Sequence, residues 1–329
     1  MKHILVGGDG FVGRYIARDL LKRGEQVIVC DMKKSPIPIY DKAEFQNVDI
    51  TKPEAVKAIN IAPDDIVYNV AARMLHPIVP RKERHAYFFS VDYEGAKLVV
   101  DHAMDSGCNR LVQFSTDMVY GLLQRTPPVS EDHPRKPLGE YSDSKRAIED
   151  YCMEKRASGL RVSLFRPRLI IGPSRLGVLT NLFRFIQKGL PIPMIGNGSN
   201  HYQMVSVFDC ASAAVCSADK GIVDSEFNLG SEDPPTVKAL LRGLIDEAHS
   251  RTILVPTPAS AVKFTLRLLD NIGMSLMVPE QYEVADTDYV IDISHTKAAL
   301  DWQPQYTDRD MFHQAYEDFI HGRTSTTAF

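Results

Sequence analysis

The sequence lacks the features that mark membrane, secreted, metal-binding and nucleic-acid-binding proteins. No stretch reaches the ~18 uninterrupted apolar residues of a membrane-spanning helix, and the opening MKHILVGGDGFVG has no signal-peptide core or cleavage site. The five cysteines form no CxxC pair and no metal spacing with histidine, which favours reduced thiols in a cytoplasmic protein. A formal net charge of −4 gives no basic surface. We therefore expect no metal site, no nucleic-acid partner and no integral membrane association.

Repeats and low-complexity segments are also missing from the chain. Its 329 residues are 44% hydrophobic and 24% charged, which fits one large domain or two closely joined domains. The end of the chain, GRTSTTAF, carries no periodic apolar pattern. We expect residues 323–329 to form a frayed tail.

What the sequence does contain begins with a strand, a glycine turn, a helix and a second strand. HILVGG is a short apolar run that ends in glycine, and the residues from Phe11 to Leu21 carry apolar side chains at helical spacing. QVIVCD then reads as another buried strand. This order opens a parallel α/β unit, so we predict a Rossmann-type doubly wound parallel sheet.

The glycine turn has the properties of a dinucleotide-binding site. Gly7, Gly10 and Gly13 allow a tight turn and let a diphosphate approach the free N–H groups at the start of the helix. Asp31 ends the second strand, where a carboxylate can bind both ribose hydroxyls and repel a 2′-phosphate. The pattern predicts NAD rather than NADP, although a strand-ending turn with an N-cap aspartate would share it.

Three further strand-like runs, NVDI, DIVYNVAA and RLVQFSTD, follow in the first half of the chain. In a doubly wound sheet, ligands bind at the carboxyl ends of the strands. We therefore expect the residues that end these runs to lie at one edge: Asp49, Ile50, Ala71, Ala72, Ser115 and Thr116.

Three tyrosines each precede a lysine by four residues, and a helix would place each pair on one face. The pairs are Tyr93–Lys97, Tyr141–Lys145 and Tyr151–Lys155. An ammonium beside a phenol lowers the phenol's pKa, so such a pair can act as an acid/base unit. Tyr141 lies at a helix start after a polar, proline-containing loop, whereas Tyr151 lies deeper in the helix on another face. We therefore select Tyr141 and Lys145.

The complete set of motifs resembles the extended short-chain dehydrogenase/reductase family, the NAD-dependent epimerase/dehydratase group. The matching residues occur in family order and span most of the chain. They are GGDGFVG at 7–13, Asp31, DI at 49–50, NVAA at 69–72, STDMVYG at 115–121, YSDSK at 141–145, FRPRLIIGP at 165–173, VSVFDCASA at 205–213 and ALDWQP at 299–304.

This resemblance implies a role for each matching residue. Tyr141 would take the hydroxyl proton as a hydride leaves the same carbon, Lys145 would bind the nicotinamide ribose, and Thr116 would bind the reacting oxygen. The residues expected to hold NAD are Gly7, Gly10, Phe11, Val12, Gly13, Asp31, Asp49, Ile50, Ala71, Ala72, Ser115, Tyr141, Lys145 and Pro167.

The resemblance also implies two domains. Residues 1–165 and 205–235 would form the NAD-binding domain, and 166–204 with 236–322 a smaller C-terminal substrate domain. The cleft between the domains is the expected substrate site. The apolar segment 261–282 of the substrate domain would be a helix packed on the core, a cover over an apolar substrate, or a contact with a membrane surface.

Several residues depart from the family pattern at the substrate site. Tyr202 stands where nucleotide-sugar enzymes carry an arginine for the diphosphate, and Met118 replaces the glutamate that partners Asp117 in dehydratases. Asp92 stands where relatives often have asparagine. We expect Asp117, Met118, Arg168 and Tyr202 to face the substrate. Other arginines that could replace the missing one, or lie in surface ion pairs, are Arg166, Arg175, Arg184, Arg251 and Arg267.

The leading hypothesis is an NAD-dependent sugar-nucleotide epimerase or related oxidoreductase. The alternative is a hydroxysteroid-dehydrogenase-like enzyme acting on an apolar or non-nucleotide secondary alcohol, and a non-catalytic NAD-binding scaffold is a third class. The segments 83–106 and 141–158 carry apolar residues on more than one face. A second apolar face needs a partner, so we expect a homodimer, unless the chain's own loops cover that face.

Overall fold

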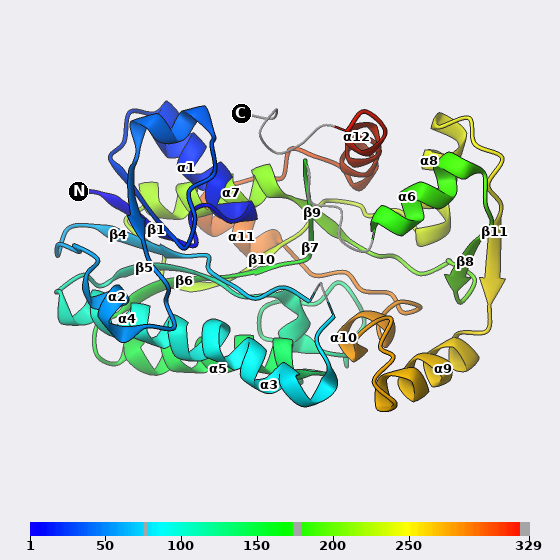
Figure 1. Ribbon diagram of the computed structural model, residues 1–329, viewed down its shortest axis with the longest axis horizontal. Coiled ribbons are helices and arrows are strands. Elements are labelled where there is room, and N and C mark those ends of the chain that lie inside the picture. Colours follow the sequence, from blue (N-terminus) through cyan, green and yellow to red (C-terminus); the bar gives the residue numbers. More distant parts are fainter. Residues whose placement is uncertain (76–77, 174–178, 323–329) are drawn as a thin grey trace.

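A seven-stranded parallel sheet forms the centre of the protein in the computed structural model, which describes residues 1–75, 78–173 and 179–322 (Figure 1). Most strands are short, fully buried apolar runs, as expected of a parallel sheet covered on both faces. The finding confirms the predicted Rossmann-type fold. The strand order is β10 (Ser225–Leu229), β6 (Arg161–Pro167), β5 (Arg110–Phe114), β4 (Ile66–Asn69), β1 (His3–Val6), β2 (Val27–Asp31) and β3 (Glu44–Asn47).

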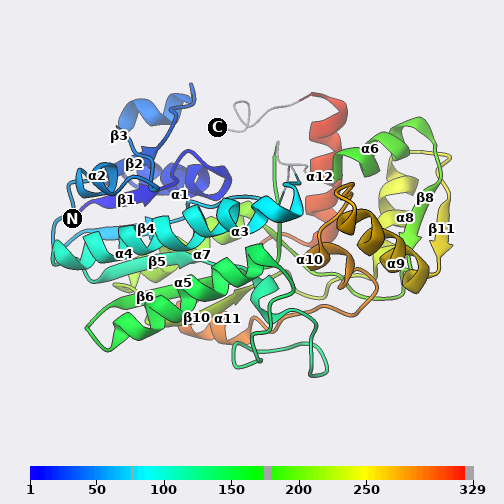
Figure 2. The ribbon, with the colours of Figure 1, turned by 60° about the horizontal axis from the view of Figure 1, so that its bottom comes forward.

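Helices cover both faces of this sheet, and Figures 1 and 2 show the two layers. On one face lie α1 (Phe11–Lys22), α7 (Val207–Asp219) and α11 (Ser294–Leu300). On the other lie α2 (Pro53–Lys57), α4 (Ala96–Asp105) and α5 (Glu140–Arg156). The helix α3 (Arg81–Phe89) continues into α4 through a π-helical turn, Ser90–Gly95.

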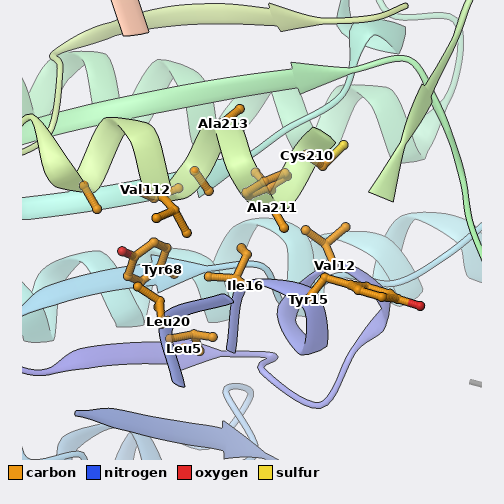
Figure 3. Packing of buried hydrophobic residues seen from close by; sticks show 14 of the residues in the cluster. Leu5, Val12, Tyr15, Ile16, Leu20, Tyr68, Val112, Cys210, Ala211 and Ala213 are labelled. Atoms are coloured by element: carbon orange, nitrogen blue, oxygen red, sulfur yellow. The ribbon is translucent and has the colours of Figure 1, made fainter. Parts of the chain in front are cut away.

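The core on the first face depends on close packing between α1 and α7. Ile16 and Leu20 of α1 are almost fully buried; Ile16 points toward the small residue Ala211 of α7, and Leu20 lies beside Tyr68 and Leu5 of the sheet (Figure 3). Small side chains on α7 allow the two helices to approach closely over the sheet. Each large side chain buried in this way contributes about 1.5–3 kcal/mol.

A second core holds together a smaller lobe at the carboxyl end of the sheet. Its helices are α6 (Leu179–Lys188), α8 (Val237–Glu247) and α12 (Asp308–Ile320), and its strands β7 (Leu169–Ile171), β8 (Ile192–Ile195), β9 (Met204–Ser206) and β11 (Leu254–Thr257). Buried residues from these elements, including Phe183, Leu244 and Phe312, form one apolar cluster. The lobe therefore has a core of its own, beside that of the sheet.

One part of the predicted substrate domain packs on the sheet instead. Ile293, Leu300 and Trp302, in and around α11, belong to the core shared by α1 and α7. The Trp302 indole N–H also donates a hydrogen bond of 2.9 Å to the Ser212 hydroxyl on α7. The stretch around α11 was predicted to belong to the substrate domain, as part of 236–322. Its apolar residues instead pack in the first core, on the sheet. The expected tail 323–329 lies outside the described residues.

The apolar segment 261–282 is only partly buried. It forms α9 (Ala259–Asn271) and α10 (Pro279–Tyr282), and an ion pair between Arg84 and Asp270 ties α9 to α3. Leu266 is buried, whereas five large apolar side chains are exposed by 51–67%: Phe264, Leu268, Ile272, Met274 and Leu276. In the described ranges, no helix has both the length and the apolar character needed to cross a membrane.

The segment expected to form a dimer contact is partly used within the chain. Phe88 and Val91 are buried, and the Phe88 ring packs edge-on against the Tyr141 ring at 5.4 Å between centroids. Tyr87 and Phe89 are only half-buried. Both half-buried rings still have contacts within the chain, since Arg73 lies over the Tyr87 ring at 4.9 Å and the Phe89 ring stacks on His85 at 4.2 Å.

Candidate functional site

A cleft of about 300 Å³ lies at the carboxyl ends of the central strands, where the strand order reverses between β1 and β4. This position is the usual ligand site of doubly wound sheets. The structure brings together here nearly all residues predicted to hold NAD. They are Gly7, Gly10, Phe11, Val12, Asp31, Asp49, Ile50, Ala71, Ala72, Ser115, Tyr141, Lys145 and Pro167.

The glycine turn shapes one wall of the cleft. Gly7 has φ +78°, and a Cβ there would lie 2.5 Å from the backbone of Ala71. Gly10 precedes α1, whose first turn has no acidic residue and no side-chain cap among the described residues. The N–H groups of that turn therefore suit an anionic group. Gly13 lies behind the cleft wall and packs against Gly7.

Asp31 is held in place at the end of β2. Its carboxylate accepts hydrogen bonds from the backbone N–H groups of Met32, at 2.7 Å, and Asp9, at 3.0 Å. Burial raises the pKa of Asp31, and these N–H groups oppose that shift. These hydrogen bonds fix the carboxylate on the cleft wall, and the bond from Asp9 ties it to the glycine turn.

Tyr141 and Lys145 also line the cleft, from the first two turns of α5. The Lys145 side chain is only 2% exposed, and its Nζ lies 3.1 Å from Oδ1 of Asp92. The same Nζ donates to the carbonyl oxygen of Phe114, at 3.4 Å. The ammonium is therefore fixed at the end of β5, beside the tyrosine.

Asp92 is the partner of Lys145 that the sequence analysis missed. It is fully buried in the π-helical turn, and its Oδ1 also accepts the backbone N–H of Arg73, at 3.1 Å. Burial raises the pKa of the Asp92 carboxyl, and the Lys145 ammonium opposes this. Single-turn π-helices occur frequently at functional sites, but helical periodicity alone gave no signal for this one.

The other two tyrosine–lysine pairs meet each other away from the cleft. The Tyr151 hydroxyl donates to Asp101, whose carboxylate also pairs with Lys97 at 2.6 Å. Both Lys97 and Lys155 lie over the Tyr151 ring, at 4.8 and 5.2 Å from its centroid. Burial and Asp101 raise the pKa of Tyr151. This cluster therefore joins α4 to α5 and does not line the cleft.

Ser115 and Thr116 face different surroundings at the end of β5. Ser115 lines the cleft, and its buried hydroxyl has no hydrogen-bond partner among the described residues. The Thr116 hydroxyl donates to Asp117 Oδ1 at 3.4 Å and accepts the Met118 N–H at 3.3 Å. Of the two hydroxyls, that of Ser115 is therefore the one unengaged at the cleft.

The residues predicted to face the substrate gather beside the cleft. Asp117, Met118 and Arg168 line a small cavity of about 10 Å³. Arg168 is buried, pairs with Asp117, and lies between the rings of Tyr202, at 4.6 Å, and Tyr289, at 4.2 Å. Tyr202, which stands in place of the family's diphosphate-binding arginine, therefore contacts another arginine, Arg168.

The other candidate arginines are distributed over the molecule. Arg166 forms a buried two-pronged ion pair with Glu149, with N–O distances of 3.0 and 2.8 Å. Arg267 pairs with Glu283 at 2.5 Å on the surface. Arg184 and Arg251 are exposed, and Arg175 lies outside the described residues.

Sequence reasoning missed several further cleft-lining residues. Val48, Val70 and Phe114 adjoin predicted positions at strand ends, so the same rule could have found them. Arg73 and Val91 come from a loop and the π-helical turn, for which the periodicity gives no signal. The remaining lining residues are Cys30, Met32, Met74 and Ile170.

The chain is similar in sequence to several known proteins. The chain is 29% identical over 324 residues to the uncharacterized protein y4nG of Sinorhizobium fredii, covering 98% of this chain and 79% of that protein. It is 24% identical to UDP-glucose 4-epimerase of Vibrio cholerae, covering 96% and 95% of the two chains.

Among solved structures, the UDP-glucose 4-epimerase of Thermotoga maritima with UDP-glucose matches with a TM-score of 0.77. The match is 20% identical and covers 98% of this chain and 99% of the other, so it supports the fold. Residues 3–230 match the NAD dependent epimerase/dehydratase family. The chain therefore belongs to that family, as its motifs predicted, and its cofactor is NAD.

Proposed function

We propose that this protein is an NAD-dependent sugar-nucleotide epimerase, or a closely related oxidoreductase, that uses Tyr141 as its base. The observation that carries this proposal is that Tyr141 and Lys145 share one cleft with Asp31 and the glycine turn. Family membership and the similarity to UDP-glucose 4-epimerases support the same reaction class. Dehydration is less well supported, because Met118 stands in place of the glutamate that would partner Asp117.

The cleft fits the chemistry of NAD along its whole length. The first turn of α1 would bind the diphosphate, and the Asp31 carboxylate would bind the ribose hydroxyls. The unpartnered Ser115 hydroxyl and the Lys145 ammonium lie at the other end, where they would hold the nicotinamide half. When bound, NAD supplies the acceptor for a hydride.

Tyr141 would take the hydroxyl proton from the substrate carbon that loses the hydride. A free phenol has a pKa of about 10, and an ammonium beside a phenol favours the ionised form. Asp92 fixes that ammonium and offsets part of its charge. A hydroxyl at 115 or 116 would bind the reacting oxygen. In an epimerase the keto sugar rotates in the cleft and takes the hydride back on its other face. The same tyrosine then returns the proton to the oxygen.

A second candidate is a dehydrogenase of an apolar or non-nucleotide secondary alcohol. The observation that favours it is the buried Arg168, whose charge Asp117 neutralises and whose faces Tyr202 and Tyr289 cover. Asp117 offsets the charge that would attract a substrate diphosphate, and Nη2 is the one guanidinium nitrogen of Arg168 without a hydrogen-bond partner among the described residues. Net formation of NADH would favour the dehydrogenase, whereas interconversion of UDP-glucose and UDP-galactose without net NADH would favour the epimerase.

Replacing Tyr141 by phenylalanine should abolish turnover, because only the proton-transferring oxygen is lost. We expect kcat to fall by about 10²–10⁴-fold, while the dissociation constant for NAD, measured by calorimetry, stays nearly unchanged. Tyr151→Phe is the matched control and should be nearly silent. If Tyr151→Phe removes activity from a folded protein instead, the choice of Tyr141 is wrong.

Asp31→Ala should narrow the preference for NAD over NADP. Removing this carboxylate removes its repulsion of the 2′-phosphate and its hydrogen bonds to the ribose. We expect the ratio of the two dissociation constants to change by about tenfold, equivalent to 1.4 kcal/mol. Equal affinity of the unmutated protein for both cofactors would refute this assignment.

Asp92→Asn should destabilise the protein by about 3 kcal/mol, because it leaves the buried Lys145 ammonium without a counter-charge. Chemical denaturation measures the change. Asp101→Asn is the matched control, because Asp101 pairs with the half-exposed Lys97. This substitution should destabilise the protein by about 1 kcal/mol or less. An Asp92→Asn protein as stable as the control variant would contradict the proposed pairing.

We expect a homodimer that buries the outer faces of α3, α4 and α5 against their copies. Sedimentation equilibrium at low micromolar concentration should give a single species at twice the 36.9 kDa of one chain. A species of 36.9 kDa alone would show instead that packing within one chain is sufficient for these helices.

A further inference from the structure

The helix that carries Tyr141 begins without a side chain of its own at the N-cap position. That residue is Gly139, whose N–H donates to the Ser142 hydroxyl at 3.3 Å and whose carbonyl accepts the Ser142 hydroxyl at 3.0 Å and the Asp143 N–H at 2.9 Å. The first N–H groups of a helix need acceptors from elsewhere. Here the carboxylate of Glu280 lies against Gly139 at the start of α5, where the backbone N–H groups of Ser142 and Tyr141 lower the pKa of that carboxyl. The cap of α5 therefore comes from α10.

Gly139 makes room for this carboxylate. Its φ of −165° is an extended conformation that any residue can adopt, so backbone strain does not explain the glycine. A Cβ at this position would lie 2.1–2.4 Å from the carboxylate atoms of Glu280. The absence of a side chain at 139 and the presence of an acid at 280 are thus parts of one contact.

Glu280 is only 4% exposed, which makes an accidental surface contact a poor explanation. Burial raises the pKa of its carboxyl, and the N–H groups of Ser142 and Tyr141, together with the charge of Arg84, oppose this. Glu280 also lines the small cavity that contains the Asp117–Arg168 pair. It connects the expected substrate region with the start of the catalytic helix.

We propose that Glu280 is a positioning residue that sets the place of Tyr141 by capping α5 from α10. The inference rests on the proposed function, in which Tyr141 is the base. An anionic cap stabilises the first helical turn, and that turn carries the tyrosine. The phenol is then correctly placed only when the segment around α10 is docked against α5.

Glu280→Ala and Gly139→Ala should produce the same two effects, the first by removing the carboxylate and the second by displacing it. Amide hydrogen exchange at residues 141 and 142 should become faster, as followed by mass spectrometry of peptides from this region. With UDP-glucose as the probe substrate, kcat should fall by about 10–100-fold, while the dissociation constant for NAD changes by less than about twofold. Glu280→Gln keeps one acceptor oxygen and should recover part of the loss.

Glu283→Gln is the matched control, because Glu283 lies on the same segment but pairs with the exposed Arg267. It should leave exchange and kcat unchanged. Unchanged exchange in Glu280→Ala would overturn the cap, and faster exchange with an unchanged kcat would overturn the positioning role. If Glu280→Ala fails to fold, Glu280→Gln and Gly139→Ala decide by the same two readouts. Loss of the proposed function itself would appear separately, as turnover that survives in Tyr141→Phe.

Discussion

The site depends on an ammonium group that is buried and must have a negative partner. The Lys145 side chain is almost inaccessible, and an unpaired charge in such a place would cost several kcal/mol. Asp92, in the π-helical turn between α3 and α4, supplies the counter-charge, and the Phe114 carbonyl accepts a further hydrogen bond. Two helices and a strand are thereby joined at the point where Tyr141 faces the cleft.

The parallel sheet places the Lys145–Asp92 pair and the glycine turn at the same edge. Because all seven strands run the same way, their carboxyl ends lie at one edge. Gly7 and Asp31 follow β1 and β2 at that edge, while Ser115 follows β5 and Tyr141 reaches it from α5. The reversal of strand order between β1 and β4 opens the cleft that these residues share. The dinucleotide cleft and the proposed acid/base pair therefore meet because of one topology.

The sheet and most of the cleft wall could be predicted because they depend on local patterns. Short apolar runs, a glycine turn and an acid at a strand end need no knowledge of distant contacts, and they located Gly7 and Asp31 correctly at the cleft. The position of each residue within its helix was enough to predict that Tyr141, and not Tyr151, lines the cleft. In the structure, Tyr151 bonds to Asp101 between two helices instead of facing the cleft.

Other features depend on contacts between residues far apart in the sequence. The pairing of Asp92 with Lys145 requires a π-helical turn that apolar periodicity does not reveal. The contact of the Glu280 carboxylate with Gly139, and the position of Arg168 over the Tyr202 ring, join residues that meet only in the folded chain. Likewise, nothing in the motif showed that the Thr116 hydroxyl points to Asp117 while that of Ser115 lines the cleft.

A crystal structure of the protein with NAD tests the central claim, that one cleft joins dinucleotide binding to the Tyr141–Lys145 pair. The account predicts the diphosphate at the first turn of α1, the adenosine ribose on the Asp31 carboxylate and the nicotinamide ribose within hydrogen-bond reach of Lys145. NAD bound in the opposite direction, or with its nicotinamide remote from Tyr141, would contradict it.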